Sequence, residues 1–387
     1  MTLTSNPTAH TQTAIADAEV LAMAAAVGAV ALEHDAAHDR DATFVTEAYD
    51  AMHDSGYLAL AVPAELGGRG ASLRQMTLAQ EELGCWSGAA ALSSTMHHYL
   101  TFVQCWRYRR GASDAAAVLG RIAHDRLVMA TSGGSDWVCP STVATEVDGG
   151  YLFNGRKGFC SQAPVATVLS TSAVLGETGP GAEVLHAGVP LAGPGVRLVE
   201  TWDTLGMRGT ASHDLVFEDV FVPADKVLGR RQYGRLEGPL LAAVVHFAPL
   251  AGAAYLGVAR GAYDEARRVV GRQAVSKPGV LRQVGEMTAR LRAARWALLG
   301  ALAETGEDLA LDQPTLETLM LAKREAVTAA RVVADLALEV AGGPAFYRTS
   351  RLERAYRDVR GGPFHPLTPE ATLDELGRTA LGSLGVR

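Results

Sequence analysis

The stretch TVATEVDGGYLFNGRKGF, residues 142–159, decides the class of this fold. Its β-branched and aromatic residues gather in short runs that favour strands, and Asp148-Gly149 and Asn154-Gly155 divide these runs. An Asn-Gly pair between two such runs predicts a two-residue hairpin, because both turn residues must take positive φ. We therefore expect antiparallel strands that turn at Asn154-Gly155.

The strand pattern extends beyond this stretch. Residues 165–174 and 215–222 have the composition of further strands, and Pro223 closes the second of them. Short strands joined by turns are typical of an antiparallel barrel or sandwich, whereas a parallel sheet would alternate strands with helices. The pattern predicts a β-domain over residues 126–235.

The first part of the chain, residues 1–125, is helical in pattern. It is rich in Ala and Leu, with apolar residues three or four positions apart. The segment 78–84 predicts a helix that stops at Gly84, and the turn-rich residues 63–68 predict a break between two helices.

The third part, residues 236–387, returns to helical spacing. Apolar stripes over residues 240–256, 280–302 and 314–340 predict three long helices in a helical bundle, for which we expect the four-helix form. The expected fold class is α+β, with an N-terminal α-helical domain, a middle antiparallel β-barrel-like domain and this C-terminal bundle. Because the segment 240–256 is nearly all apolar, we also expect a homo-oligomer that buries the bundle helices.

The composition excludes several classes of function. The 387 residues include 35 Lys+Arg and 42 Asp+Glu, a formal charge of −7, so nucleic acid is not an expected partner. The chain has no G-x-G-x-x-G after a strand and no G-x-x-x-x-G-K, which excludes the standard dinucleotide and P-loop sites. The apolar run over residues 20–32 is shorter than the ~20 residues of a membrane span. We expect a cytoplasmic protein with no membrane partner.

The cysteines indicate neither a metal site nor a disulfide framework. Cys85, Cys105, Cys139 and Cys160 form no C-x-x-C pair and have no His at metal-ligand spacing. Free thiols in a reducing compartment are the expected state.

Five local strings carry a resemblance to a known family. They are MATSGGSD (129–136), YLFNGRKGFCS (151–161), LGMRGT (205–210), VFEDVFVP (216–223), and Gly342-Gly343 followed by Glu353-Arg354 and Arg357-Asp358. In this order they resemble the T-E-P-G-A-G-S-D, N-G-x-K-x-W-I-T, L-G-x-R-G-(S/T), F-x-D-V-x-V-P and G-G…E-R…R-D motifs of the acyl-CoA dehydrogenase superfamily. Counted from Thr131, the first string runs to Asp136 and is two residues shorter than its counterpart in the family.

The resemblance implies FAD, bound non-covalently between the β-domain and the bundle of a homodimer or homotetramer. The residues that it assigns to FAD are Thr131 and Ser135 in the loop that meets the flavin and its pyrophosphate, Phe159 beside the isoalloxazine, Ser161 facing the N5 edge, Arg268 or Arg272 toward the pyrophosphate, and Gly342 and Gly343 toward the adenine half of a neighbouring subunit's FAD. Purely structural roles stay open for several of them: Phe159 in the core, Ser161 as a turn cap and the two glycines as a helix stop.

The chain departs from the family at the catalytic base. The family's desaturases remove an α-proton with a Glu that follows the R-D pair, eight residues after its Asp. Eight residues after Asp358 this chain has Pro366. His365, one residue earlier, and Glu370, four residues later, are the candidates that remain. A second position that carries the Glu in some members holds Phe247 here.

Histidines point to a second branch of the superfamily. Its monooxygenases, which use reduced flavin and O₂, tend to carry a His on an N-terminal helix and a His-Pro pair near the C-terminus. This chain has His97-His98 and a His365 that is bracketed by prolines, which predict a stiff extended loop. Imidazole can act as a base near neutral pH. We expect His365 to be the general base of the site, with Glu370, His97 and His98 as further catalytic candidates.

Three functions follow. The first is a flavin dehydrogenase that desaturates an acyl thioester or a similar substrate and passes electrons to an external acceptor. The second is a two-component monooxygenase that receives reduced flavin from a separate reductase. The third is a catalytically inactive homologue that serves as a binding protein. The family favours the first function, and the histidines favour the second.

Overall fold

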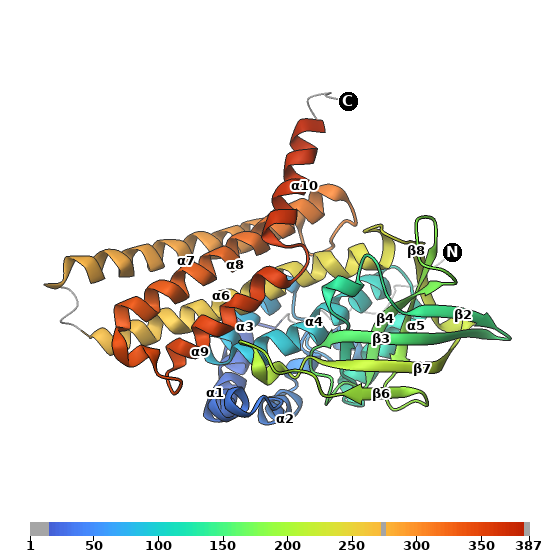
Figure 1. The fold of residues 1–387 in the computed structure, drawn as a ribbon, viewed down its shortest axis with the longest axis horizontal. Coiled ribbons are helices and arrows are strands. Elements are labelled where there is room, and N and C mark those ends of the chain that lie inside the picture. Colours follow the sequence, from blue (N-terminus) through green and yellow to red (C-terminus); the bar gives the residue numbers. More distant parts are fainter. Residues whose placement is uncertain (1–14, 272–275, 383–387) are drawn as a thin grey trace, which may run out of the picture.

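A computed structural model describes residues 15–271 and 276–382 of the chain. The predicted order of helices, sheet and helices is confirmed. Figure 1 shows the sheet at one end of the molecule and the long C-terminal helices extending away from it. The N-terminal helices pack against the first C-terminal helix, so the two helical parts share one hydrophobic core.

Within residues 15–125, the first helical part contains five α-helices. They are α1 (Asp17–Asp41), α2 (Thr46–Ser55), α3 (Leu73–Trp86), α4 (Gly88–Arg109) and α5 (Ser113–His124). The break predicted over residues 63–68 is present as the short turn η2 (Ala64–Leu66). A capping box starts α3: the Ser72 hydroxyl accepts from the Gln75 N–H, and the Gln75 side chain accepts from the Ser72 N–H.

The predicted helix stop at Gly84 is wrong, because α3 continues to Trp86. This glycine serves helix packing instead. A Cβ atom on Gly84 would lie 2.4 Å from the Ala254 carbonyl oxygen, and one on Gly257 would lie 2.2 Å from the Glu81 carbonyl oxygen. Two glycines therefore allow the backbones of α3 and the first C-terminal helix to approach each other closely.

The middle part is a single eight-stranded sheet. Its strands are β1 (Met129–Thr131), β2 (Val143–Val147), β3 (Gly150–Cys160), β4 (Val168–Leu175), β5 (Glu183–Pro190), β6 (Val196–Val199), β7 (His213–Pro223) and β8 (Val227–Gln232). The order is β6-β7-β3-β2-β4-β5-β8, with β1 beside β4. All pairs are antiparallel except β1–β4 and β2–β4.

The predicted hairpin at Asn154-Gly155 is also wrong, because both residues lie inside the continuous strand β3. The turn lies instead at Asp148-Gly149, the preceding turn-forming pair in the sequence. There Gly149 has φ of 76° and the chain passes from β2 into the antiparallel strand β3. The register of β3 against β7 shifts beside Asn154, whose side chain donates to the Asp219 carboxylate at 2.9 Å. Asn-Gly thus marks a bulge, another site at which glycine is favoured.

The C-terminal part contains α6 (Gly238–Val270), α7 (Pro278–Thr305), α8 (Gln313–Ala341), α9 (Arg351–Asp358) and α10 (Pro369–Gly382). The three long helices match the three predicted stripes. Figure 1 shows α6, α7 and α8 running side by side, with α10 projecting from the body.

The reason for expecting an oligomer needs correction. The segment 240–256 of α6 is covered within a single chain by α3, α4 and α8, so it requires no partner subunit. Exposed apolar side chains lie elsewhere, on α7 (Leu281 and Trp296) and after α8 (Phe346 and Tyr347). A homo-oligomer remains a prediction, and these side chains are the better argument for it.

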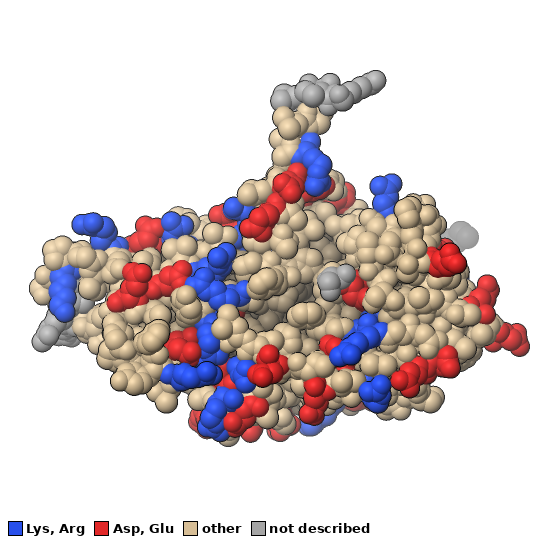
Figure 2. All heavy atoms as spheres, viewed as in Figure 1, with Lys and Arg blue, Asp and Glu red and all other residues tan. Residues whose placement is uncertain are grey.

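The surface charge, the apolar helices and the cysteines can be compared with the expectations from composition. On the face drawn in Figure 2, acidic and basic side chains are interspersed. Two helices, α1 and α6, are long and apolar enough to cross a membrane, but 89% of the apolar window of α6 is buried inside the protein. Within the described residues the four cysteines are free and no cluster of metal ligands occurs.

Candidate active site

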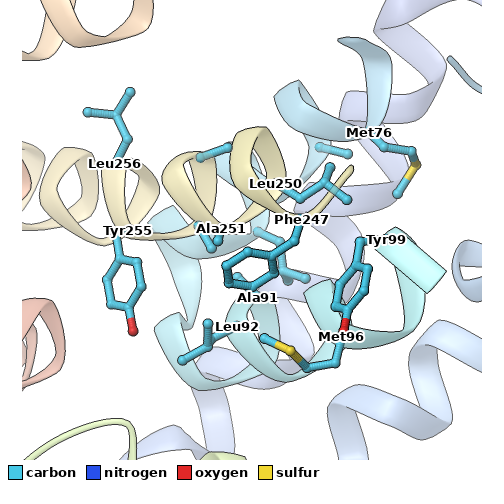
Figure 3. Packing of buried hydrophobic residues seen from close by; sticks show 14 of the residues in the cluster. Met76, Ala91, Leu92, Met96, Tyr99, Phe247, Leu250, Ala251, Tyr255 and Leu256 are labelled. Atoms are coloured by element: carbon cyan, nitrogen blue, oxygen red, sulfur yellow. The ribbon is translucent and has the colours of Figure 1, made fainter. Parts of the chain in front are cut away.

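A cavity of about 530 Å³ lies where the sheet meets the helical body. Loops of the β-domain form one wall, with Phe159 and Ser161, and α4, α6 and the chain after α9 form the other. Figure 3 shows Phe247 and Tyr255 projecting from α6 on the side where Leu92 and Met96 of α4 lie. Cavities of this size, apolar with a few polar groups, are typical small-molecule sites.

Phe159 occupies a strained position at the rim of the cavity. Its φ is +56°, its side chain is 59% exposed, and its ring packs edge-to-face on Trp202 with centroids 5.7 Å apart. Gly133 lies directly beneath, where a Cβ atom would be 2.6 Å from the Phe159 Cβ. Positive φ at a bulky residue persists only where the surroundings enforce it, and such residues cluster at functional sites.

Three hydroxyl groups form a chain that ends at the cavity. Ser161 and Ser212 are 2.7 Å apart, Ser212 and Thr210 are 2.7 Å apart, and the Thr210 hydroxyl donates to the Met207 carbonyl at 2.9 Å. Ser161 and Ser212 line the cavity. Because Thr210 donates to the Met207 carbonyl, Ser212 donates to Thr210 and Ser161 donates to Ser212. The Ser161 oxygen is therefore left to accept a hydrogen bond from a ligand N–H or O–H.

A buried ion pair shapes the loop between β1 and β2. The Lys157 ammonium donates to Asp136 and to the Ser172 carbonyl, both at 2.6 Å. Asp136 also accepts from the Ser132 hydroxyl at 2.9 Å, and the Trp137 indole N–H donates to the Ser132 carbonyl at 2.9 Å. Burial lowers the pKa of Lys157, whereas the neighbouring Asp136 raises it by stabilising the charged form of Lys157. The pair fixes the loop that carries Gly133 into the cavity wall.

On the helical wall, His365 meets Tyr255. The Tyr255 hydroxyl lies 2.8 Å from His365 Nε2, and both residues line the cavity. His365 is extended (φ −77°, ψ 137°), as predicted, but the preceding Phe364 ends the 3-10 helix η8 (Val359–Phe364), so the predicted non-helical loop is wrong at Phe364. Burial and the nearby Lys323 ammonium lower the pKa of His365 to about 3, so its ring is neutral at physiological pH.

The structure places the other catalytic candidates away from this cavity. Glu370 is exposed in the first turn of α10. His97 is fully buried: its Nδ1 accepts from the Met129 N–H at 3.1 Å and its Nε2 donates to the Leu58 carbonyl at 3.0 Å. His98 is equally buried, and neither of its ring nitrogens has a hydrogen-bond partner in the described structure. Neither histidine lines the cavity.

The candidate flavin residues separate into two groups. Phe159 and Ser161 line the cavity, whereas Thr131 lines a second cavity of about 390 Å³ that shares Ser132 and Trp137 with the first. Ser135 belongs to the turn η3 (Gly134–Asp136).

The rest of the candidates lie at the far end of the bundle. Arg268 is near the end of α6, 72% exposed and paired with Glu265, while Gly342 and Gly343 follow α8 and are exposed. Figure 1 shows these ends of α6 and α8 on the side away from the sheet. Arg272 falls outside the described residues. In one chain, therefore, none of the described members of this group reaches the cavity.

Comparisons with known proteins agree with this architecture. The N-terminal, middle and C-terminal domain models of acyl-CoA dehydrogenases match residues 14–108, 130–220 and 250–369. The chain belongs to the acyl-CoA dehydrogenase superfamily.

Its relatives have diverse names. The amino sugar nitrososynthase DnmZ of Streptomyces peucetius is 31% identical over 89% of this chain and 88% of its own length. YdbM of Bacillus subtilis (strain 168), which is named as a putative acyl-CoA dehydrogenase, is 30% identical over 89% of this chain and 92% of its own length. The probable FMNH2-dependent monooxygenase SfnC of Pseudomonas putida is 29% identical over 86% of this chain and 87% of its own length. The solved structure of KijD3 with FMN and a dTDP-linked 3-amino-4-keto sugar has a TM-score of 0.82 at 27% identity, over 96% of this chain and 95% of that one.

Sequence reasoning missed Tyr255 and Lys323. Lys323 lies on α8 between the buried Leu319 and Val327, four residues from each. A lysine inside an apolar stripe is the signal that could have identified it, because a buried charge needs a specific partner. Tyr255 is one of only two polar side chains in the segment 240–256, the other being His246.

Proposed function

We propose that this chain is a flavin-dependent monooxygenase that uses reduced flavin and O₂ to oxygenate a small molecule. One oxygen atom of O₂ would enter the substrate and the other would leave as water, with two electrons from the reduced flavin. A separate reductase would supply that flavin. The names of the nitrososynthase and monooxygenase relatives support this choice.

One observation carries the proposal: among the described residues that line the cavity, none is Asp or Glu. A desaturase must remove an α-proton while hydride leaves, which requires an effective base. The cavity offers His365 at the expected place, but an imidazole with a pKa of about 3 is a weak proton acceptor. The same neutral ring is a good hydrogen-bond donor, which oxygen chemistry can use.

The cavity fits a flavin ring. Phe159 offers a planar face at the rim, and Gly133 leaves room for the Phe159 side chain. The Ser161 oxygen can accept from a ring N–H. A bound reduced flavin would supply the electrons and activate O₂; the residues of the chain would orient it and exclude water. We propose FMN as this flavin, since FMN is the cofactor named with KijD3. FAD would in addition require Arg268, Gly342 or Gly343 from a neighbouring subunit.

The charges around the cavity indicate an uncharged reacting group. Arg357 is already paired with Asp39 and Glu353, and Arg360 with Asp335. The adjoining cavity is lined by hydroxyl groups and by Arg107 and Arg230, which are paired with Asp114 and Glu183. It could hold the remainder of a larger substrate. We propose a neutral amine, thioether or aromatic carbon as the position that is oxygenated.

The test compares an oxygenation assay with an anaerobic flavin-reduction assay. Purified protein is supplied with FMN, NADH and a flavin reductase in air, and a panel of amines, thioethers and aromatic compounds is screened for oxygenated products. In parallel, flavin-loaded protein is mixed anaerobically with a panel of acyl-CoA thioesters. Oxygenated product without thioester-driven flavin reduction supports the proposal. Flavin bleaching by a thioester, with no oxygenated product, would instead support the desaturase function of the family.

A further inference from the structure

We propose that Tyr255 and Lys323 are positioning residues that present His365 to the cavity as a neutral hydrogen-bond donor through Nδ1–H. This inference rests on the proposed function and deepens it, because it assigns His365 a donor role in place of the general-base role expected from its sequence position. It depends on two contacts, one to the ring and one to the backbone.

The ring contact fixes the tautomer. Tyr255 is fully buried, which raises the pKa of its hydroxyl well above 10, so the group keeps its proton. His365 Nε2, at 2.8 Å, is the only hydrogen-bond partner of this hydroxyl in the described structure. A buried hydroxyl donates wherever an acceptor exists, so Nε2 accepts and Nδ1 carries the ring hydrogen.

The remaining nitrogen is open to the cavity. Nδ1 of His365 has no hydrogen-bond partner among the described residues. It is also not among the unpartnered polar atoms that are buried away from solvent, so it faces open space. The side chain lines the cavity beside Phe247, with ring centroids 5.7 Å apart. Its N–H is therefore free to donate to a bound flavin or to the substrate, whereas the lone pair that a general base needs is occupied by Tyr255.

Two glycines make this contact possible. A Cβ atom on Gly361 would lie 2.8 Å from the Tyr255 hydroxyl oxygen, and one on Gly362 would lie 2.7 Å from Val327. The chain after α9 can therefore pack directly on α6 and α8. The Gly361-Gly362 pair is accounted for by this approach, since a larger residue would move His365 away from Tyr255.

The backbone contact comes from Lys323. Its side chain is 2% exposed, and its ammonium donates to the carbonyl oxygens of His365 (2.8 Å), Pro366 (3.2 Å) and Leu367 (2.8 Å). An ammonium has three N–H donors, and three carbonyls accept them. No carboxylate pairs with Lys323 in the described structure.

A buried lysine without an acidic partner is costly, and burial lowers the pKa of Lys323 to about 7. A loop of three residues could be held by neutral groups at lower cost. The charge has a second effect, because a cation behind the loop disfavours protonation of the imidazole in front of it. Lys323 thus holds the loop and adds to burial, which is the main cause that keeps the ring neutral.

The tautomer can be read without flavin or substrate. We would label the histidines with ¹⁵N, record ring signals of the flavin-free protein at pH 7, and assign those of His365 with the variant His365→Gln. The expected spectrum has a protonated Nδ1 and an unprotonated Nε2. Tyr255→Phe should shift His365 toward the other tautomer. The matched control is Tyr263→Phe on the same helix, whose hydroxyl bonds to Thr288 at 2.9 Å and which should leave the His365 signals unchanged.

Lys323→Met should broaden or split the His365 signals while the remaining histidine signals stay in place. If this variant fails to fold, the wild-type tautomer still decides. A protonated Nε2 in the wild-type protein would overturn the inference, whatever reaction the enzyme performs. A protonated Nδ1 in a protein that never oxygenates a substrate would leave the positioning intact and contradict the proposed function instead.

Discussion

The two walls of the cavity were encoded in different ways. On the β side, Phe159, Ser161 and the Lys157–Asp136 pair lie within about thirty residues of one another and coincide with short family strings. On the helical side, His365 depends on Tyr255 and Lys323, which are 110 and 42 residues away. The β wall is built by local sequence, whereas the helical wall exists only after α6, α8 and the C-terminal segment pack together.

The largest expected effect is on the β wall. Lys157→Met leaves Asp136 buried without its partner, and the loss of one member of a buried pair costs about 3–5 kcal/mol. Urea unfolding should report this loss. Arg156→Met is the matched control, because Arg156 is its neighbour and pairs with Asp214 at the surface, where an ion pair contributes about 0–1 kcal/mol. Equal losses in the two variants would mean that the buried pair does not organise this wall.

The next effect is on the helical wall. His365→Ala should retain flavin but lose turnover by roughly 10²-fold or more, the usual cost of removing a donor or acid–base group from an active site. Steady-state rates and the flavin content of the purified variant measure both parts. Glu370→Gln is the control and should behave as wild type, since Glu370 is exposed on α10. An active His365→Ala beside an inactive Glu370→Gln would move the catalytic role to Glu370.

A smaller effect tests the floor of the flavin site. Gly133→Ala places a methyl group against Phe159 and should weaken flavin binding by roughly 10-fold, about 1.4 kcal/mol, measured by fluorescence titration. Gly120→Ala on α5 is the control, because a Cβ atom there meets no atom within 4 Å. If both variants bind flavin equally well, the ring does not lie beside Phe159.

The smallest expected effect concerns pH. Because the folded-state pKa of His365 is about 3, its charge does not change between pH 5 and 8, and kcat should not rise through pH 6.5. Lys323, with a pKa of about 7, loses its proton as the pH rises, so kcat should fall on the alkaline side. Lys323→Met should remove that fall. An ascending limb near pH 6.5 that disappears in His365→Gln would restore the general-base role.

The comparison of the walls also explains what the sequence could predict. The three-part fold follows from hydrophobic periodicity. Local strings identified Phe159, Ser161 and His365 as site candidates, and the structure brings all three to one cavity. The Asn154-Gly155 hairpin and the Gly84 stop failed because glycine serves bulges and close helix packing as well as turns. Tyr255 and Lys323 were missed because their roles depend on contacts between distant segments. His97 and His98 lie outside the cavity, and both ring nitrogens of His97 hydrogen-bond to the backbone, so a catalytic role for the two histidines stays a prediction.

The central claim is that this cavity performs oxygen chemistry. The most direct measurement supplies the protein with reductase, NADH and FMN under ¹⁸O₂ and analyses the product of the best substrate in the amine, thioether and aromatic panel by mass spectrometry. We expect one ¹⁸O atom in the product and loss of that product in His365→Ala. A product that contains no ¹⁸O, formed equally well without O₂ when another electron acceptor is present, would contradict it.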